Sequence, residues 1–233
     1  MKILALDTSA TVASVAVTED LTPLAVYTLN NKNTHSETLL PMIESALKAL
    51  SLDASDIDLF ALSAGPGSFT GVRIGAATIK GIAFAKEKPC EEVSTLEALA
   101  TNLIFRKGLI CPVMNARRSQ VYTALFRSNG TTLERIMPDS ALSIAELDEI
   151  LAEYGEPIAL VGDGYEITEK GFTKTPLAFV PEALRLQSAL SVAMVAFNKY
   201  SSGEQTTDLN LSVNYLRPSQ AERERAEREE QNK

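Results

Sequence analysis

The segment that decides the fold spans residues 65–75 and reads Gly65-Pro66-Gly67-Ser68-Phe69-Thr70-Gly71-Val72-Arg73-Ile74-Gly75. It follows a short apolar run, residues 59–62, which is typical of a buried strand. After it, through residue 86, apolar and small residues recur at helical spacing. The pattern therefore predicts a strand, a glycine turn and a helix. The turn lies at the carboxyl end of the strand, where open α/β sheets bind their ligands.

The glycines of this segment have two interpretations. Bare backbone N–H groups at a helix start form an anion nest, which makes Gly65 and Gly67, together with Asp7, candidate residues of a nucleotide cleft. Alternatively, Gly65 and Gly67 supply only positive φ, and Gly71 and Gly75 only permit close packing. Neither of the two common phosphate-binding motifs, the P-loop and the dinucleotide fingerprint, matches the segment.

Gly71 and Gly75 each reduce helix stability by about 1 kcal/mol relative to alanine. That cost indicates a helix face pressed against a neighbouring backbone, within this chain or across an interface.

The composition limits the class of protein. The chain has 233 residues and a formal net charge of -8, so most of its surface is expected to repel phosphate backbones. Contact with RNA is therefore expected through a partner.

Cys90 and Cys111 are not spaced as a metal pair and are expected to be buried and reduced. The first apolar run, residues 3–6, is too short for a signal peptide or membrane span, so a cytoplasmic location without a membrane is expected.

The chain repeats one plan. Strands are predicted at residues 3–6, 13–17 and 24–29, followed by a helix opened by a capping box at residues 34–37, the strand at 59–62, the glycine turn and its helix. The second copy has strands near residues 109–114, 121–126 and 132–137, a capping box at 143–146, a strand at 158–161, the turn Gly162-Asp163-Gly164, and a helix over about 182–200. Asp7 and Asn115 occupy the same place in the two copies.

Such duplication predicts an α/β fold with two similar lobes of the actin, hexokinase and Hsp70 (ASKHA) type, each a mixed sheet with helices. We place an N-terminal lobe at residues 1–105, a C-terminal lobe at 106–217 and a charged tail at 218–233. The tail is expected to be a solvated or frayed helix, with a partner-binding arm as the alternative. Folds of this class normally hold a nucleotide between the lobes.

Few side chains are suited to catalysis. Asp7 either holds a metal-bound water beside a phosphate or caps its own turn. Beyond Asn115, the arginines Arg117 and Arg118 either meet an anion or form surface salt bridges. His35 is the only histidine and lies in the first turn of a helix, which favours a capping or exposed role and leaves no histidine pair for a metal.

Five stretches carry a family resemblance: Ile3-Leu4-Ala5-Leu6-Asp7-Thr8-Ser9, Thr34-His35-Ser36 with Leu39-Leu40-Pro41, the segment 65–75, Val93-Ser94-Thr95-Leu96, and Tyr215-Leu216-Arg217. Over nearly the whole chain they resemble TsaB, also called YeaZ. TsaB is the bacterial subunit of the machinery that makes N6-threonylcarbamoyladenosine (t6A) in tRNA. The chain departs from the family pattern in one place. The family usually reads Asp-Ala-Arg where this chain has Asn115-Ala116-Arg117, and a following position that is acidic in the family is Gln120 here. This departure argues against a charge-based role for this loop but not against the resemblance to the family.

The resemblance implies a non-catalytic subunit. The catalytic paralogue TsaD carries a His-x-x-x-His metal pair whose positions correspond here to Thr95 and Leu99, and leucine cannot ligate a metal. TsaB pairs with TsaD, and TsaE joins as an ATPase. TsaD then modifies adenosine 37 of tRNAs that read codons beginning with A. The resemblance thus implies contact with tRNA only through the complex and no cofactor or metal of the chain's own, with ATP or ADP at a complex interface left open.

The resemblance also implies a pairing surface on the helix after Thr34 and the helix after Ser68, which meet their counterparts in TsaD or, when the chain is alone, in a second copy. The candidate contact residues are Leu39, Leu40, Ile43, Gly71 and Gly75. The alternative is that these apolar residues face their own sheet.

Two other functions stay open from the sequence. An active nucleotide-dependent phosphotransferase of the same fold would need Asp7 and the glycine turn to close on ATP. A peptidase would need a bound metal such as zinc or iron.

Overall fold

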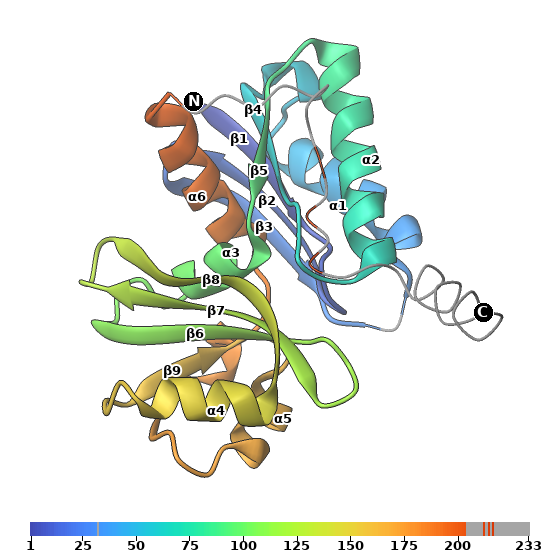
Figure 1. Ribbon diagram of the computed structural model, residues 1–233. Coiled ribbons are helices and arrows are strands. Elements are labelled where there is room, and N and C mark those ends of the chain that lie inside the picture. The colour runs from blue at the N-terminus through green and yellow to red at the C-terminus, as the bar shows by residue number, and fades with distance from the viewer. Residues whose placement is uncertain (32, 204–211, 213, 215, 217–233) are drawn as a thin grey trace, which may run out of the picture.

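The computed structural model describes residues 1–31, 33–203, 212, 214 and 216, which form two lobes, each built on one five-stranded sheet (Figure 1). The predicted tail at 218–233, with Tyr215 and Arg217 of the family resemblance, lies outside the described residues.

The first sheet has the strand order β3-β2-β1-β4-β5. Its strands are β1 (Lys2–Asp7), β2 (Ala13–Glu19), β3 (Thr22–Leu29), β4 (Leu59–Ser63) and β5 (Cys90–Val93). The first three form an antiparallel meander, whereas β4 runs parallel to both β1 and β5. Helices α1 (His35–Ala49) and α2 (Phe69–Lys86) cover one face of this sheet. Because helices cover both of its faces, β4 is apolar along nearly its whole length.

The second sheet repeats the same plan, with the order β10-β9-β6-β7-β8. Its strands are β6 (Gly108–Asn115), β7 (Gln120–Ser128), β8 (Leu133–Ser143), β9 (Ile158–Val161) and β10 (Leu177–Ala178). Its helices α4 (Ile144–Ala152) and α5 (Tyr165–Gly171) stand where α1 and α2 stand in the first half. The predicted repetition of one plan is thus confirmed for the two sheets and for the helices that follow the capping boxes.

Both predicted capping boxes are present. The Glu37 carboxylate accepts the Thr34 N–H at 3.2 Å before α1, and the Glu146 carboxylate accepts the Ser143 N–H at 2.9 Å before α4. These bonds satisfy backbone donors that a helix start otherwise leaves open, which explains why the same signal opens the same helix in each half.

The third helix of each half packs on the other lobe. Helix α3 (Thr95–Thr101) ends the first half, yet Leu96 and Leu99 belong to the core of the second sheet. Helix α6 (Ala189–Ser201) ends the second half, yet Val192 and Ala196 pack on the open face of the first sheet. Figure 1 shows α3 between the lobes and α6 alongside the first sheet. The predicted lobe boundary between residues 105 and 106 stays a prediction. In the packing, however, α3 belongs with the second sheet and α6 with the first sheet.

Buried polar contacts fix the exchanged helices. The Asn102 side-chain amide, at the end of α3, donates to the Leu184 carbonyl at 3.1 Å and to the Leu186 carbonyl at 2.8 Å. The same side chain accepts the Ser191 hydroxyl of α6 at 2.6 Å. These bonds tie α3 to the segment leading into α6, so each exchanged helix orients the other.

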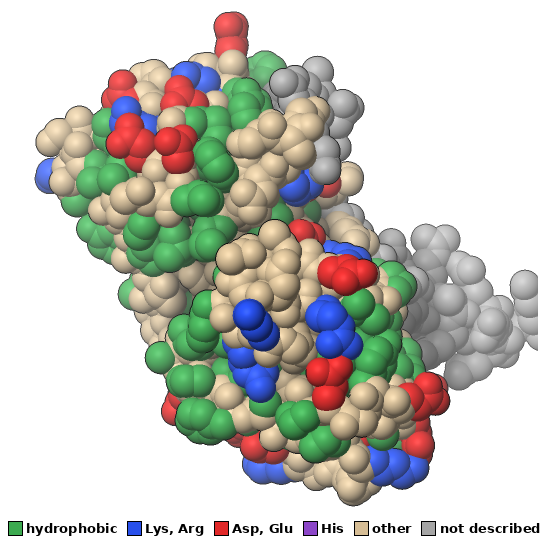
Figure 2. Space-filling view, turned by 90° about the vertical axis from the view of Figure 1, so that its left-hand side faces the viewer, with side chains coloured by type: hydrophobic (Ala, Val, Ile, Leu, Met, Phe, Trp, Pro, Cys, Tyr) green, Lys and Arg blue, Asp and Glu red, His purple; other side chains and the backbone are tan. Residues whose placement is uncertain are grey.

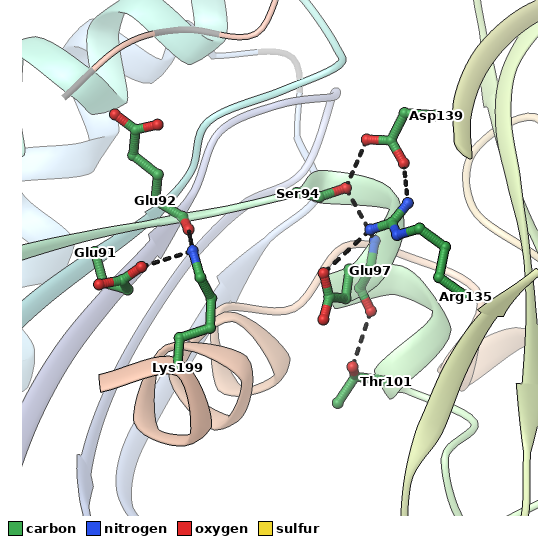
Figure 3. A network of polar contacts seen from close by, with 8 residues as sticks. All are labelled: Glu91, Glu92, Ser94, Glu97, Thr101, Arg135, Asp139 and Lys199. Atoms are coloured by element: carbon green, nitrogen blue, oxygen red, sulfur yellow. Dashed lines mark hydrogen bonds and ion pairs between the residues drawn. The ribbon is translucent and has the colours of Figure 1, made fainter. Parts of the chain in front are cut away.

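A second set of polar contacts crosses between the lobes (Figure 3). Ser94, just before α3, donates to Asp139 of β8 at 2.8 Å, and Arg135 of β8 pairs with Glu97 of α3 at 3.1 Å. Arg135 also pairs with Asp139 on its own strand and stacks over Phe126. The contacts join the start of α3 to the edge of the second sheet.

One ion pair of this region has a fully buried carboxylate and a partly exposed lysine. Lys199 Nζ of α6 lies 2.6 Å from Glu91 Oε1 of β5, and the Glu91 side chain is 0% exposed. Lys199 also donates to the Glu92 carbonyl at 2.6 Å (Figure 3). The pair joins an exchanged helix to the first sheet. Because Glu91 is fully buried, removal of Lys199 would leave its carboxylate buried without this partner.

The structure corrects one predicted helix and lengthens one strand. Residues 182–200 do not form one helix: a short 3₁₀ turn, η2 (Glu182–Leu184), precedes α6, and Ser188 is the N-cap of α6. The counterpart of α2 is instead the short helix α5, which follows the Gly162-Asp163-Gly164 turn directly. Strand β8, predicted near 132–137, extends to Ser143 because it pairs with β7 along nearly its whole length.

The two cysteines are confirmed as free, buried thiols. Burial raises the pKa of Cys111 to about 12, so its thiol stays protonated at neutral pH. Among the described residues, no helix combines the length and the apolar character that crossing a bilayer requires.

We predict that Lys199→Met destabilises the protein by about 3 kcal/mol, because it leaves the Glu91 carboxylate buried and unpaired. Adding Glu91→Gln should restore most of that loss, since the pair is then removed as a unit. Urea unfolding of the two variants measures both effects, and a single variant as stable as the parent would show that the ion pair does not hold α6.

Candidate functional site

The predicted glycine turn is covered by the turn between β1 and β2. The Ser68 N–H donates to the Ser9 carbonyl at 2.6 Å, and the Thr8 hydroxyl donates to the Gly71 carbonyl at 2.8 Å. Thr8 and Ser9 are both about as buried as the core residues around them. The carboxyl end of β1 is therefore clamped onto the start of α2.

This clamp explains the glycines of α2. A Cβ at Gly71 would collide with the Thr8 carbonyl, and one at Gly75 would lie 2.5 Å from the Thr8 hydroxyl oxygen. A Cβ at Gly67 would likewise collide with the Ser9 carbonyl. The neighbouring backbone that the sequence predicts for this helix face is thus the chain's own first hairpin.

The start of the turn is also occupied by protein groups. Gly65 has φ of +110°, a conformation that favours glycine, and a Cβ there would lie 2.5 Å from the Asn214 carbonyl oxygen. The Asn214 N–H donates to the Ala64 carbonyl at 2.7 Å, and the Thr95 N–H donates to the Gly65 carbonyl at 2.9 Å. Where a nucleotide cleft would need open backbone groups, Gly65 thus contacts Asn214 and Thr95 of the same chain.

Asp7 lies at the end of β1 and is 1% exposed. One carboxylate oxygen accepts the Ser9 N–H at 2.9 Å and the Ser9 hydroxyl at 2.7 Å, and the other accepts the Ser63 hydroxyl at 2.5 Å. Burial raises the pKa of Asp7, and the bonds from Ser63 and Ser9 oppose that rise. Both oxygens of Asp7 are thus engaged in joining β1 to its own turn and to β4.

Asp163 is a site residue that the sequence analysis does not single out. It follows β9 as the glycine turn follows β4, and it is exposed beside the Gln187 amide, whose nitrogen lies 3.4 Å from its carboxylate. Surrounding protein raises the pKa of Asp163, and the charge of Asp7 adds to that rise. Asp7 thus ends β1, whereas Asp163 follows β9, the counterpart of the neighbouring strand β4. The sequence signal that links the two halves here is the matching of the two glycine turns.

The side chain of His35 joins the start of α1 to the first hairpin. Its Nε2 lies 2.7 Å from the Ala10 carbonyl, so the imidazole binds the tip of the first hairpin from the start of α1. Beside it opens a pocket of about 260 Å³. The lining residues are Thr11, Asn31, Asn33, Thr34, His35, Ser68, Thr70, Gly71 and Ile74. The pocket thus lies between the first hairpin and the starts of α1 and α2.

The candidate pairing residues divide by burial. Leu39 and Ile43 are 1% and 3% exposed and pack in the core beneath α1, whereas Leu40 is 51% exposed. Gly71 and Gly75 are buried against Thr8, as described above. Of the five candidates, Leu40 is the one whose side chain is exposed on the outer face of α1.

The positions that correspond to the paralogue's metal pair are both buried. Thr95 is 0% exposed at the start of α3, and Leu99 is 1% exposed within the core of the second lobe. Among the described residues, no group of three or more His, Cys, Asp or Glu side chains is placed to hold a metal ion.

The loop with Arg117 and Arg118 is exposed and left-handed. Arg117, Arg118 and Ser119 have φ between +52° and +62°, and the Asn115 side chain accepts the Arg117 N–H at 2.8 Å. Asn115 thus shapes the hairpin as a neutral side chain. None of the ion pairs found among the described residues includes Arg117 or Arg118.

Comparison with known proteins gives a consistent result. Residues 26–224 match the family profile described as "TsaD: tRNA N6-adenosine threonylcarbamoyltransferase". The chain is 37% identical over 162 residues to the tRNA threonylcarbamoyladenosine biosynthesis protein TsaB of Bacillus subtilis, covering 70% of this chain and 71% of that one. It is 28% identical over 220 residues to the Escherichia coli TsaB, covering 93% and 95% of the two chains.

A solved structure agrees over nearly the full length. YeaZ from Pseudomonas aeruginosa superposes with a TM-score of 0.78 at 25% identity, covering 92% of this chain and 99% of that one. The predicted two-lobed fold class is therefore confirmed.

We predict that Gly75→Ala destabilises the isolated chain by about 1–3 kcal/mol, because the new Cβ overpacks the buried Thr8 hydroxyl. The matched control is Gly81→Ala on the same helix, where nothing lies within 4 Å of the added Cβ. That variant should instead gain up to about 1 kcal/mol from helix propensity. Urea unfolding compares them, and equal stability of the two variants would show that Thr8 does not constrain the helix.

Proposed function

The chain belongs to the TsaB (YeaZ) family and is a t6A biosynthesis protein, and from this we propose that it is a non-catalytic subunit that binds TsaD and allows TsaE to join. In this proposal TsaD transfers the threonylcarbamoyl group to adenosine 37 of tRNAs that read codons beginning with A, in the cytoplasm. The present chain supplies the surface on which the complex assembles.

One observation carries the proposal. Thr95 and Leu99, which correspond to the metal-binding histidines of TsaD, are buried in the packing between the lobes. A threonine and a leucine offer no imidazole nitrogen to a metal. Both carboxylate oxygens of Asp7 already accept hydrogen bonds from protein groups, and Asn214 covers Gly65. These contacts support the proposal that the chain has no working nucleotide cleft of its own.

The surface charge supports an indirect role toward tRNA. The chain has a formal net charge of -8. On the face shown in Figure 2, acidic, basic and hydrophobic side chains are interspersed, and the basic ones do not form an extended stripe. Since a protein that binds RNA by itself normally relies on such a stripe, we assign the RNA contact to other subunits.

We assign the TsaD contact to the outer faces of α1 and α2, with Leu40 as an apolar anchor. Beside it, Thr34 and Thr70 line the pocket at the starts of the two helices and supply polar contacts. A second copy of the chain would occupy the same face when TsaD is absent. A TsaD helix laid on α1 would cover Leu40, which is half-exposed in the single chain.

We expect co-purification with TsaD and TsaE, and t6A formation by the three proteins that is lost when this chain is left out. The isolated chain should not modify tRNA, because it lacks the catalytic positions of TsaD. If TsaD and TsaE alone modified tRNA at the same rate, or if this chain did so unaided, the proposal would be wrong.

The surface assignment has its own test. Leu40→Glu should weaken TsaD binding by about tenfold or more, because it buries a charge in an apolar contact. Phe179→Glu is the matched control, since Phe179 is 81% exposed on the C-terminal lobe and should leave binding unchanged. Calorimetric titration with TsaD distinguishes them, and equal affinities would place the contact elsewhere.

A further inference from the structure

Helix α2 contains a glycine that the chain's own packing does not explain. Gly81 lies in the second half of this helix and is exposed. Its backbone is helical, and among the described residues nothing lies within 4 Å of a Cβ added there. After proline, glycine is the residue that least favours a helix interior. Gly71 and Gly75 are required by Thr8, so Gly81 needs a reason outside the chain.

Gly81 belongs to an exposed line along the outer face of α2. Residues four apart lie above one another on a helix, and Arg73, Ala77, Gly81 and Ala85 follow this spacing. All four are exposed, whereas the buried residues of α2 face the sheet. Phe84 stands beside this line and is 71% exposed. Figure 1 shows α2 on the outside of the first lobe, so this face is open to a partner.

The face has the relief that a second helix requires. The distance between two packed helix axes depends on the side chains at their crossing. Gly81 has no side chain there, so a partner helix can come closest at this position. Phe84, three residues further along the chain, is the large apolar side chain that would enter a groove of that helix.

The charge of α2 indicates which kind of helix fits. From Phe69 to Lys86 the chain has three basic residues and no acidic one, although the whole chain has 30 acidic and 22 basic residues. Lys86 pairs with Asp53 at 3.1 Å. In the part of the chain that the structure describes, Lys80 belongs to none of the ion pairs. A second copy would bring the same basic helix to this face, whereas an acidic helix is complementary to it.

We propose that the outer face of α2 packs on a helix of TsaD that has a small residue where it crosses Gly81 and acidic residues facing Arg73 and Lys80. Phe84 anchors this contact in an apolar groove of the partner helix. The contact rests on the proposed function, because TsaD is its partner. It adds to the anchor Leu40 of α1 the position of the helix crossing and the chemistry of the partner's helix.

Enlarging Gly81 tests the crossing. Gly81→Leu should weaken TsaD binding about tenfold or more in calorimetric titration, because the new side chain holds the two helices apart. The isolated variant should be at least as stable as the parent in urea, since leucine favours a helix and the site is open. Affinity and stability then change in opposite directions, which a purely structural role of Gly81 would not produce. Ala145→Leu, at an exposed position of α4, is the matched control and should leave both unchanged.

Two further variants test the anchor and the charge. Phe84→Ala should weaken TsaD binding about tenfold, because it empties the groove that Phe84 fills. Lys80→Glu should weaken binding at low salt and reduce its dependence on salt, since it removes an attraction that salt screens. Lys170→Glu, an exposed lysine of α5, is the control and should change neither.

The outcomes separate this contact from the proposed function. If folded Gly81→Leu and Phe84→Ala bind TsaD as tightly as the parent while Leu40→Glu does not, the α2 contact is wrong and the proposed function stands. If the parent chain does not bind TsaD at all, both are wrong. Weakened binding by both α2 variants, with unfolding curves of a folded chain, supports the contact.

Discussion

The contact between the first hairpin and the glycine turn is the constraint on which the rest of the structure depends. Thr8 and Ser9 close onto Ser68 and Gly71 through two short hydrogen bonds, and no side chain larger than glycine fits beneath them. Asp7 completes the contact by joining its own turn to Ser63 of the neighbouring strand. The carboxyl end of β4, the edge at which open α/β sheets bind ligands, is thus in contact with the chain's own first hairpin.

The exchange of α3 and α6 gives the two lobes a common core. Each helix ends one half of the chain and packs on the sheet of the other half, so the lobes are joined by apolar packing as well as by the polar contacts of Asn102 and Lys199. A body fastened in this way holds its outer helices in fixed positions. That property suits a subunit whose proposed role is to present a surface to a partner.

Much of the fold could be predicted because its signals are local. The capping boxes at Thr34 and Ser143, the alternation of strands and helices, and the glycine turn all depend on residues close together in the chain. The exchange of helices could not be predicted, since an amphipathic helix shows which of its faces is apolar but not which sheet that face meets. The same limit explains the long predicted helix over 182–200, in which apolar spacing continued through η2 into α6.

The sequence could place the candidate residues on their helices and turns, but it could not give their contacts. Helical spacing placed Leu39, Leu40 and Ile43 together, but only the structure shows that Leu40 alone points to solvent. The reason for glycine at position 75 lies in Thr8, a residue distant in sequence, and the contact of Gly65 with Asn214 joins residues that are further apart still. Contacts of this kind become visible only when tertiary structure is known.

Titration of the isolated chain with ATP and Mg²⁺, followed by calorimetry and by phosphate release, tests most directly whether the chain has kept a working cleft. Because Asp7 and the turn at Gly65 are engaged by protein groups, we expect neither saturable heat nor turnover. Stoichiometric binding with hydrolysis by the chain alone would contradict a non-catalytic role.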